Sequence, residues 1–293
     1  MPELPDIDVY VATLDNTIGG KTLNEIRTGH PFLVRSVAPP ISELSGHKVR
    51  SLRRIGKRIA IGFDNDLWIV LHLMVAGRLH WKTAKPALAG KQQIAALDFD
   101  DGSLLLTEAG TKKRASLHVV AGKTGLAELD PGGLEPLDCT IDEFARTVRI
   151  ENHTLKRCLT DPHLFSGIGN AYSDEILHAA RLSPVLLTQK LTDRQIEALF
   201  DATASTLTNW RDLLMREADG KLPKKVTAFH DGMAVHGRYA KPCRVCGEPV
   251  QRIRYKDNET NYCARCQTGS RILKDRSLSR LLKKDWPKTL DDL

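Results

Sequence analysis

The amino-acid sequence predicts an α+β protein with an N-terminal β-sandwich behind a leading helix, a helical middle part and a small C-terminal ribbon. Short β-branched or alternating segments fill residues 48–120, and apolar residues recur at helical spacing over residues 141–215. Two C-x2-C pairs follow in the last part of the chain. With 293 residues, of which 41% are hydrophobic, the chain has enough apolar side chains for about two domains.

The leading helix is predicted from Ile7, Val11, Leu14 and Ile18, which recur at i, i+4, i+7 and i+11. Short strands then follow one another without intervening helices, separated by Gly, Asn and Asp turns. That order favours a sandwich or barrel over βαβ repeats. The expected strands cover residues 49–55, 59–63, 67–73, 94–99, 103–106 and 117–120.

Glycine and proline mark the end of the strand-rich part, since six of them fall between Gly122 and Asp138 and predict a linker. The last helix beyond this linker has a start signal in Thr192 and Asp193. The expected helices cover residues 141–149, 154–160, 171–180 and 193–215.

A glycine-bearing turn, S-G-I-G-N over residues 166–170, opens onto the third of these helices. Free N–H groups at a helix start, with the Asn170 side chain beside them, can hold a phosphate oxygen. An ordinary helix–helix turn with an Asn cap is the alternative, and a G-x-G pattern alone does not decide between the two.

The charge of the chain is unevenly distributed. Lys and Arg total 43 against 36 Asp and Glu, a formal net charge of +7, and residues 211–293 alone hold 19 bases and 11 acids. Basic stretches of this kind favour binding to a polyanion, and nucleic acid is the first candidate. The alternative interpretation is a charged surface that is only solvated. A second basic cluster comprises Arg50, Arg53, Arg54, Lys57 and Arg58.

Several classes of protein are excluded. No uninterrupted apolar run approaches the ~18 residues that a membrane helix requires, and the apolar fraction argues against a disordered chain. The first eight residues, MPELPDID, have neither the basic nor the apolar region of a secretory signal. We therefore expect a cytoplasmic protein that does not contact a membrane.

Four of the six cysteines form two C-x2-C pairs separated by 16 residues, namely Cys243, Cys246, Cys263 and Cys266. Two such pairs flanking a β-hairpin place four thiolates tetrahedrally around one Zn²⁺ ion. Two disulfides or a redox-active pair are the alternatives, and a cytoplasmic setting disfavours the disulfides. A site with four protein ligands has no open position, so this zinc would stabilise a zinc ribbon and take no part in catalysis.

The N-terminal segment offers a nucleophile. Removal of Met1 would leave Pro2 with a free secondary amine, which can attack an aldehyde-level sugar carbon and form an iminium. A terminal amine titrates near about 8, below lysine, and the positive end of a helix lowers that value further. Glu3 is suited to general acid–base work beside it, and Lys57 could neutralise a leaving phosphate. A plain helix start, with proline in its first turn and acids near the dipole, is the alternative.

These features occur along the chain in the order of one family. The motifs are MPELPDI, Lys57 after an Arg-rich strand, His72-Leu73 followed by Gly77, the S-G-I-G-N-A-Y-S-D-E-I-L turn and the ribbon PCRVCG…YCARCQ. From Pro2 to Gln267 the chain resembles the formamidopyrimidine-DNA glycosylase/endonuclease VIII (Fpg/Nei) family of bifunctional DNA glycosylases with AP-lyase activity. The resemblance implies a β-sandwich, a helix-two-turn-helix domain and a zinc finger, with damaged DNA bound across the cleft between the halves.

The resemblance also implies roles for individual residues. Pro2 would be the Schiff-base nucleophile, Glu3 the acid and Lys57 a phosphate-contacting catalytic lysine. Asn170 and Lys156 would contact phosphate from the helix-two-turn-helix domain. From their charge, further phosphate contacts are expected at Arg54, Arg252 and Arg254.

The chain departs from the family at the residues that read the lesion. The family's methionine wedge falls on Val75, and Met74 lies where glycine is expected. The loop that fills the space of an extruded base reads E-A-G-T-K-K-R-A over residues 108–115, without an aromatic residue, and the DNA-contacting arginine of the ribbon falls on Asn258. Residues 221–236 replace a lesion-capping loop. Because extruding a weakly stacked base costs least, we expect a preference for abasic, single-stranded or bubble DNA over 8-oxoguanine paired with cytosine.

The sequence therefore predicts a monomeric base-excision-repair enzyme that excises damaged bases and cleaves the strand by β-elimination followed by δ-elimination, with one structural Zn²⁺. A DNA-structure-binding protein that retains AP-lyase chemistry but little base excision is the competing hypothesis. The expected domains are a catalytic β-sandwich over residues 1–122, a linker over 123–138, a helix-two-turn-helix domain over 139–236, the zinc ribbon over 237–270 and a basic C-terminal tail over 271–293.

Overall fold

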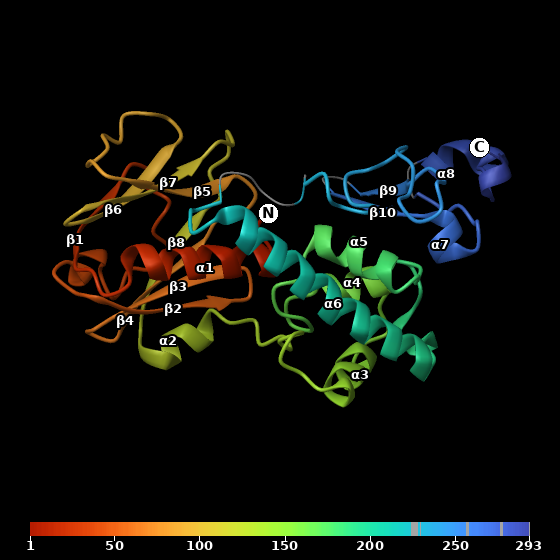
Figure 1. The fold of residues 1–293 in the computed structure, drawn as a ribbon, viewed down its shortest axis with the longest axis horizontal. Helices are drawn as coiled ribbons and strands as arrows, with labels where there is room; N and C mark the ends of the chain where they lie inside the picture. Colours follow the sequence, from red (N-terminus) through yellow and green to blue (C-terminus); the bar gives the residue numbers. More distant parts are fainter. Residues whose placement is uncertain (224–227, 229, 256–257, 276–277, 293) are drawn as a thin grey trace. The chain divides into compact units, whose positions relative to one another are not determined.

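The computed structural model describes residues 1–223, 228, 230–255, 258–275 and 278–292 (Figure 1). The chain forms two compact units. Unit 1 comprises Met1–Pro131 and Trp210–Thr227, and unit 2 comprises Gly132–Asn209 and Ala228–Leu293. Among the described residues, no helix is long and apolar enough to cross a membrane.

Unit 1 begins with helix α1 (Leu4–Ile18), which contacts one of two four-stranded antiparallel sheets (Figure 1). The first sheet has the order β1 (Leu23–Thr28), β6 (Gln93–Phe99), β7 (Gly102–Glu108) and β5 (Gly77–Lys82). The second has the order β2 (Val49–Ile55), β3 (Arg58–Phe63), β4 (Leu67–His72) and β8 (Ser116–Ala121). The predicted leading helix and N-terminal β-sandwich are confirmed.

One apolar core joins the two sheets and the helix. Side chains alternate along each strand, so that Leu117 and Val119 of β8 enter this core while Val70 of β4 faces the opposite side of the sheet. Burying each such side chain contributes roughly 1.5–3 kcal/mol. The core includes, from α1 and both sheets, Ile7, Leu14, Ile61, Ile69, Leu97 and Leu106.

Two strands were not expected from the sequence, β1 and β5. Both lie at the edges of the first sheet. Of the six residues of β1 only Leu23 is buried, because an edge strand tolerates polar side chains that a central strand excludes. The apolar alternation of these strands is therefore weak, although β5 pairs with β7 in regular register and β1 pairs with β6 with one register shift, between Leu23 and Glu25.

The linker expected over residues 123–138 differs in the structure, because helix α2 (Gly122–Glu128) occupies its first half. Leu126 of this helix packs with Ala60 and Val70 on the outer face of the second sheet. A seven-residue helix with two glycines has little stability of its own, so its packing on the sheet stabilises it. For this reason the local sequence did not predict the helix.

Unit 2 contains the predicted helices. They are α3 (Ile141–Arg149), α4 (Leu155–Thr160), α5 (Asn170–Ala179) and α6 (Asp193–Ala218), with a 3-10 turn η2 (Thr188–Lys190) before α6. The start signal at Thr192 is a reciprocal cap, since Thr192 and Gln195 exchange side-chain to backbone hydrogen bonds. Helix α6 begins in unit 2, and its last residues, from Trp210 to Ala218, belong to unit 1.

The ribbon consists of β9 (Gln251–Tyr255) and β10 (Asn258–Tyr262), paired antiparallel, followed by α7 (Ala264–Thr268). Asn258 and Glu259 are the first two residues of β10. Residues 256–257, and residues 224–227 and 229 of the segment over 221–236, lie outside the described residues.

The segment expected as a basic tail over residues 271–293 is folded in its described part, with α8 (Leu278–Leu282) and the 3-10 turns η4 (Lys283–Asp285) and η5 (Leu290–Asp292). The Leu273 N–H donates to the Tyr262 hydroxyl at 2.7 Å, and the buried Asp275 carboxylate accepts from the Arg254 N–H at 2.6 Å. The segment thus satisfies one backbone donor of β9, the Arg254 N–H, and packs on the ribbon. Its apolar contacts with the ribbon join Ile253, Tyr262, Ala264, Ile272, Leu273 and Leu290.

A buried glutamate anchors the chain segment that leads into the ribbon. Glu175 of α5 accepts hydrogen bonds from the backbone N–H groups of Ala234, Val235 and His236 at 2.7–2.9 Å. Burial raises the pKa of this carboxyl, and the three N–H donors oppose the shift. A carboxylate with three donors is well suited to fix a loop that has no regular secondary structure.

We predict that Glu175→Gln lowers the free energy of unfolding by about 2 kcal/mol, because the amide turns an NH2 group toward backbone donors and leaves at least one of them unsatisfied. Urea unfolding of the zinc-loaded protein measures the change. Glu197→Gln on α6 is the matched control, since Glu197 is exposed and its replacement should stay within about 0.5 kcal/mol. Equal effects of the two variants would contradict the anchoring role.

We predict that Leu273→Ala destabilises the ribbon by about 1–2 kcal/mol, less than the loss at a fully buried leucine, because Leu273 is half-buried against Ile253 and Tyr262. Leu281→Ala should have almost no effect, because that side chain is 78% exposed. Zinc release on mild heating, followed with a colorimetric chelator, compares the two variants. If the segment did not pack on the ribbon, the two variants would release zinc at the same temperature.

Candidate active site and nucleic-acid interface

The N-terminal segment is fixed before helix α1 begins. Pro2 is buried, and Glu3 at the N-cap and Asp6 in the first turn are 3% and 5% exposed. Asp6 accepts a hydrogen bond from the Glu3 N–H at 2.9 Å, one half of a capping box. Two buried carboxylates therefore lie within the first six residues, at the positive end of the helix.

The N-terminal amine, carried by Met1 in this structure, lies within reach of four charged groups. Burial lowers its pKa; the charges of Glu3 and Asp6 raise it, and those of Arg78 and Lys57 lower it. These charges come from α1, from the turn between β2 and β3 and from the start of β5. The structure thus brings the predicted Pro2, Glu3 and Lys57 to one place, with Arg78 as a fourth, unpredicted member.

Lys57 owes its position to a tight hairpin. Ile55 of β2 pairs with Arg58 of β3, so only Gly56 and Lys57 form the turn, and Gly56 adopts a φ of 55°. Arg54 fastens this hairpin to α1, because its Nε donates to Asp8 at 2.8 Å and its guanidinium to the Gly56 carbonyl. That internal ion pair gives Arg54 a structural role, and a phosphate contact of Arg54 stays a prediction.

The turn between β4 and β5 presents the predicted wedge. Met74 has a φ of 52° and is half-buried, whereas Val75 is 58% exposed at the tip of the turn. Gly77 closes the turn, since its N–H donates to the Leu73 carbonyl and a Cβ there would lie 2.3 Å from that oxygen. Of the two candidates, Val75 is the one whose side chain is available for contact.

The loop after β7 is closed on itself. The Glu108 carboxylate, 1% exposed, accepts hydrogen bonds from the backbone N–H groups of Arg114 and Ala115 at 2.9 and 3.2 Å. Residues 109–113 form its tip, which carries Lys112 and Lys113 and no aromatic side chain. The loop therefore presents cations and backbone beside the wedge turn, because the position of a Cβ on Gly110 lies 3.7 Å from the Ala76 Cβ.

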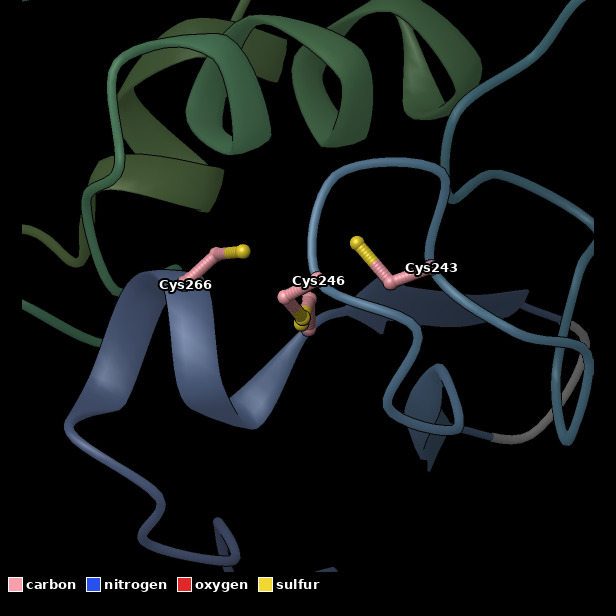
Figure 2. Close-up of side chains that lie close together, drawn as sticks. Cys243, Cys246 and Cys266 are labelled. Carbon is pink, nitrogen blue, oxygen red and sulfur yellow. The ribbon is translucent and has the colours of Figure 1, made fainter.

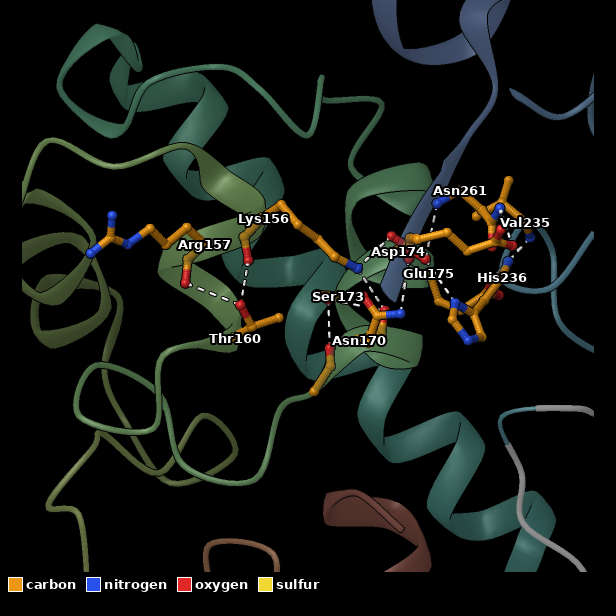
Figure 3. Close-up of polar contacts among 12 residues, drawn as sticks. Lys156, Arg157, Thr160, Asn170, Ser173, Asp174, Glu175, Val235, His236 and Asn261 are labelled. Carbon is orange, nitrogen blue, oxygen red and sulfur yellow. Dashed lines mark hydrogen bonds and ion pairs between the residues drawn. The ribbon is translucent and has the colours of Figure 1, made fainter. Parts of the chain in front are cut away.

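In unit 2 a second set of predicted residues converges on the start of α5 (Figure 3). The Lys156 ammonium donates to the Asn170 carbonyl at 2.6 Å and to the buried Asp174 carboxylate. Asp174 also contacts the His236 ring at 2.7 Å and accepts from the Asn261 N–H at 3.1 Å. Lys156 therefore fixes the turn that carries Asn170, and a direct phosphate contact of Lys156 stays a prediction.

The Asn170 side chain connects this turn to the ribbon. Its Nδ2 donates to the carbonyl of Glu259 in β10 at 2.9 Å, and the Glu259 carboxylate lies 3.4 Å from the Arg252 guanidinium. Arg252 also stacks over the Tyr239 ring, 3.9 Å from its centroid. Arg252 is thus held near Asn170, whereas Arg254 contributes its backbone N–H to Asp275.

The four predicted zinc ligands meet in unit 2, and Figure 2 labels three of them, Cys243, Cys246 and Cys266. Their Sγ atoms all lie within 4.8 Å of one another. Zn–S bonds of about 2.3 Å in a tetrahedron separate the sulfurs by about 3.8 Å, so the cluster fits one structural Zn²⁺. His178 Nε2 of α5 lies 3.4 Å from Cys243 Sγ. Burial and the charge of Arg181 lower the pKa of His178, so a neutral ring can donate to the thiolate and tie α5 to the metal site.

The structure assigns functions to residues that the sequence did not single out, among them Arg78, Asp174, Glu175 and His178. Asp174 stands three residues from Ala171 and three from Leu177, so helical spacing could have placed it on the buried face. No local pattern marks Arg78 or His178, because their partners come from distant parts of the chain.

Three family models match successive parts of the chain. They are the formamidopyrimidine-DNA glycosylase N-terminal domain over residues 1–112, the formamidopyrimidine-DNA glycosylase H2TH domain over residues 133–210 and the zinc finger found in FPG and IleRS over residues 240–269. The last match agrees with the four-cysteine cluster.

Full-length relatives and solved structures agree with these matches. A formamidopyrimidine-DNA glycosylase of Mycobacterium leprae is 32% identical over 287 residues, which cover 92% of this chain and 100% of the relative. One from Listeria monocytogenes is 28% identical over 281 residues, covering 91% and 100%. The Fpg structure from Thermus thermophilus has a TM-score of 0.76 at 27% identity, covering 91% of this chain and 98% of that one. The fold, the zinc site and the full-length relatives together place this chain in the formamidopyrimidine-DNA glycosylase family of base-excision-repair enzymes.

Proposed function

We propose that this DNA glycosylase is bifunctional, excising a damaged base through a Schiff base on Pro2 and cleaving the strand at the resulting abasic site. The observation that carries the proposal is the convergence of Glu3 and Lys57 on the N-terminal amine, here that of Met1 next to the buried Pro2, whose pKa is lowered by burial. A lowered pKa leaves more of the amine unprotonated and nucleophilic at neutral pH.

The chemistry follows from these groups. Once Met1 is removed, the Pro2 nitrogen attacks C1′ of the damaged nucleoside, and the bond from C1′ to the base breaks as the base leaves with a proton. Glu3 protonates the sugar ring oxygen, the ring opens and the iminium forms. Loss of a C2′ proton then expels the 3′ phosphate by β-elimination, and a δ-elimination expels the 5′ phosphate. Hydrolysis of the iminium restores the amine.

Phosphate contacts hold the strand during these steps. In this proposal Lys57, on the β2–β3 turn, neutralises a phosphate next to the reacting sugar, and its effect on the pKa of the terminal amine supports this role. In unit 2, Asn170 offers its amide beside the first N–H groups of α5, and Arg252 and Arg254 add positive charge on the ribbon. The protein acts as a monomer in this scheme, since every proposed group belongs to one chain.

The wedge turn and the closed loop support a preference among lesions. Val75 is smaller than methionine, and the loop over residues 108–115 brings no aromatic ring to fill the space of an extruded base. Less of the cost of extrusion is therefore recovered, which favours bases that are weakly stacked at the outset. Abasic, single-stranded and bubble DNA are the substrates expected to be processed best. A Lactococcus lactis Fpg structure holds DNA with an oxidised pyrimidine, and another holds abasic DNA.

A protein that binds unusual DNA structures and retains AP-lyase activity with little base excision is the second candidate. The missing aromatic side chain in residues 108–115 favours it. The two candidates differ in one measurement, the release of a damaged base from intact DNA.

We predict that borohydride traps the protein covalently on a duplex containing an abasic site, and that the adduct maps to the N-terminal peptide by mass spectrometry. Pro2→Gln should reduce trapping about 100-fold or more, because the bulkier residue keeps Met1 attached and removes the secondary amine. Glu3→Gln should reduce base excision by about 100-fold or more. Intact mass, zinc content and affinity for abasic DNA verify that the variants are folded; an adduct on an internal lysine would contradict the proposal.

We predict that excision under single-turnover conditions is about tenfold faster from bubble DNA than from a duplex with 8-oxoguanine opposite cytosine, a difference of roughly 1.4 kcal/mol in the barrier. Val75→Met should reduce this difference in excision rate, because methionine is a larger wedge. Val37→Met is the matched control, because Val37 is 93% exposed outside the wedge turn. Faster excision from the paired duplex by the unmodified protein would refute the preference, and no excision from either substrate would favour the second candidate.

A further inference from the structure

Arg78 clasps the wedge turn from its C-terminal side. It is the second residue of β5, and its Nη1 donates to the backbone carbonyls of Val75 at 3.2 Å and Gly77 at 2.5 Å. One guanidinium nitrogen thus holds the carbonyls at the two ends of the segment Val75–Gly77, in which Val75 is exposed and Gly77 is buried. A turn whose carbonyls are engaged in this way presents its side chain in a restricted set of orientations.

The same guanidinium belongs to the surroundings of the N-terminal amine. Burial lowers the pKa of Arg78, and the charges of Tyr10 and Asp6 on α1 raise it. Burial also raises the pKa of Tyr10 to about 12, and Arg78 opposes that shift. Tyr10 is therefore neutral at pH 7, and Asp6 is the charged partner that compensates the desolvated guanidinium. Arg78 consequently lies between the wedge turn and the first turn of α1.

We propose that Arg78 is a positioning residue that ties the Val75 turn to the N-terminal nucleophile, so that the wedge and the attacking amine keep one relative geometry. This inference rests on the proposed function, because it concerns the same amine and the same wedge. It adds a residue that neither the sequence motifs nor the family comparison singles out. Without Arg78 the Val75 turn would lose its fixed orientation, so base extrusion would become less efficient. No group that reacts with the sugar would be removed.

The charge of Arg78 also affects the protonation of the N-terminal amine. The charged groups that face it are Glu3 and Asp6 from α1, Lys57 from the β2–β3 turn and Arg78 from β5. The two carboxylates favour the protonated ammonium, and the two cations favour the free amine. Removing the Arg78 charge shifts that balance toward the carboxylates. The amine then remains protonated to a higher pH, and its reactions require a more alkaline solution.

The test uses Arg78→Met and Arg78→Lys in the full-length, zinc-loaded protein. The rate of trapping on abasic DNA is measured against pH, and base excision from bubble DNA is measured alongside. For Arg78→Met we expect the pH midpoint of trapping to rise by about half a unit or more, and base excision to fall about tenfold relative to trapping at its own optimum. Arg78→Lys should keep the midpoint, because it keeps the charge, but recover excision only in part, because an ammonium lacks the planar fork.

Lys82→Met is the matched control, since it removes an exposed charge from the other end of the same strand. It should change neither the midpoint nor the ratio of excision to trapping. In the free protein, the pH dependence of reductive methylation of the terminal amine gives a readout that does not require catalysis. An unchanged midpoint and an unchanged ratio in Arg78→Met, with normal trapping by the unmodified protein, would overturn the role of Arg78 alone. Absence of trapping by the unmodified protein would overturn the proposed function, and the methylation profile would then report separately on whether Arg78 acts on the amine.

Discussion

Asp174 and Glu175 occupy consecutive positions of α5 with almost no solvent exposure, so every oxygen of the two carboxylates needs a donor. Asp174 takes its donors from Lys156, His236 and Asn261, and Glu175 takes three backbone N–H groups from the segment before the ribbon. Removing one partner of such a buried pair leaves an uncompensated charge, which is far costlier than losing a surface ion pair. The start of α5, the α4 lysine and the ribbon hairpin are therefore held as one assembly, and the Asn170 turn and the zinc cluster depend on it.

Buried charges are also compensated at the start of the chain, in unit 1. Glu3 and Asp6 are buried beside the N-terminal amine, and Lys57 and Arg78 bring the opposite charge from two other elements. Helix α1 can place its first turn there only because its apolar face packs into the core shared with the sheets. Burial of this turn against the core also lowers the pKa of the terminal amine, here that of Met1, so the packing of the fold and the electrostatics of the site have one cause.

The chain combines a family scaffold with features of its own. The three family models end at residue 269, and the described part of the segment that follows packs on the ribbon through Leu273, Leu290 and the buried Asp275. The wedge turn carries Val75, and the loop after β7 is closed by Glu108 rather than filled by an aromatic ring. Under the proposed function, the wedge turn and the loop would affect which bases are extruded, while the groups proposed to carry the covalent chemistry are retained. The described part of the C-terminal segment adds apolar contacts to the ribbon.

The sequence by itself determined the elements with a strong local pattern: the leading helix, the central strands, the helices with capping residues and the four-cysteine cluster. In each of these the signal is local, either a period set by backbone geometry or a spacing set by one metal ion. The sequence did not predict the edge strands β1 and β5 or helix α2, because their stability comes from packing against residues far away in the chain. Arg54 was also expected to contact DNA because of its charge, and Lys156 because of the family resemblance, whereas the structure pairs them with Asp8 and Asp174. Only the tertiary structure decided these partners, and with them the place of Arg78, since the energy of a buried charge depends on which groups the fold brings within a few ångströms of it.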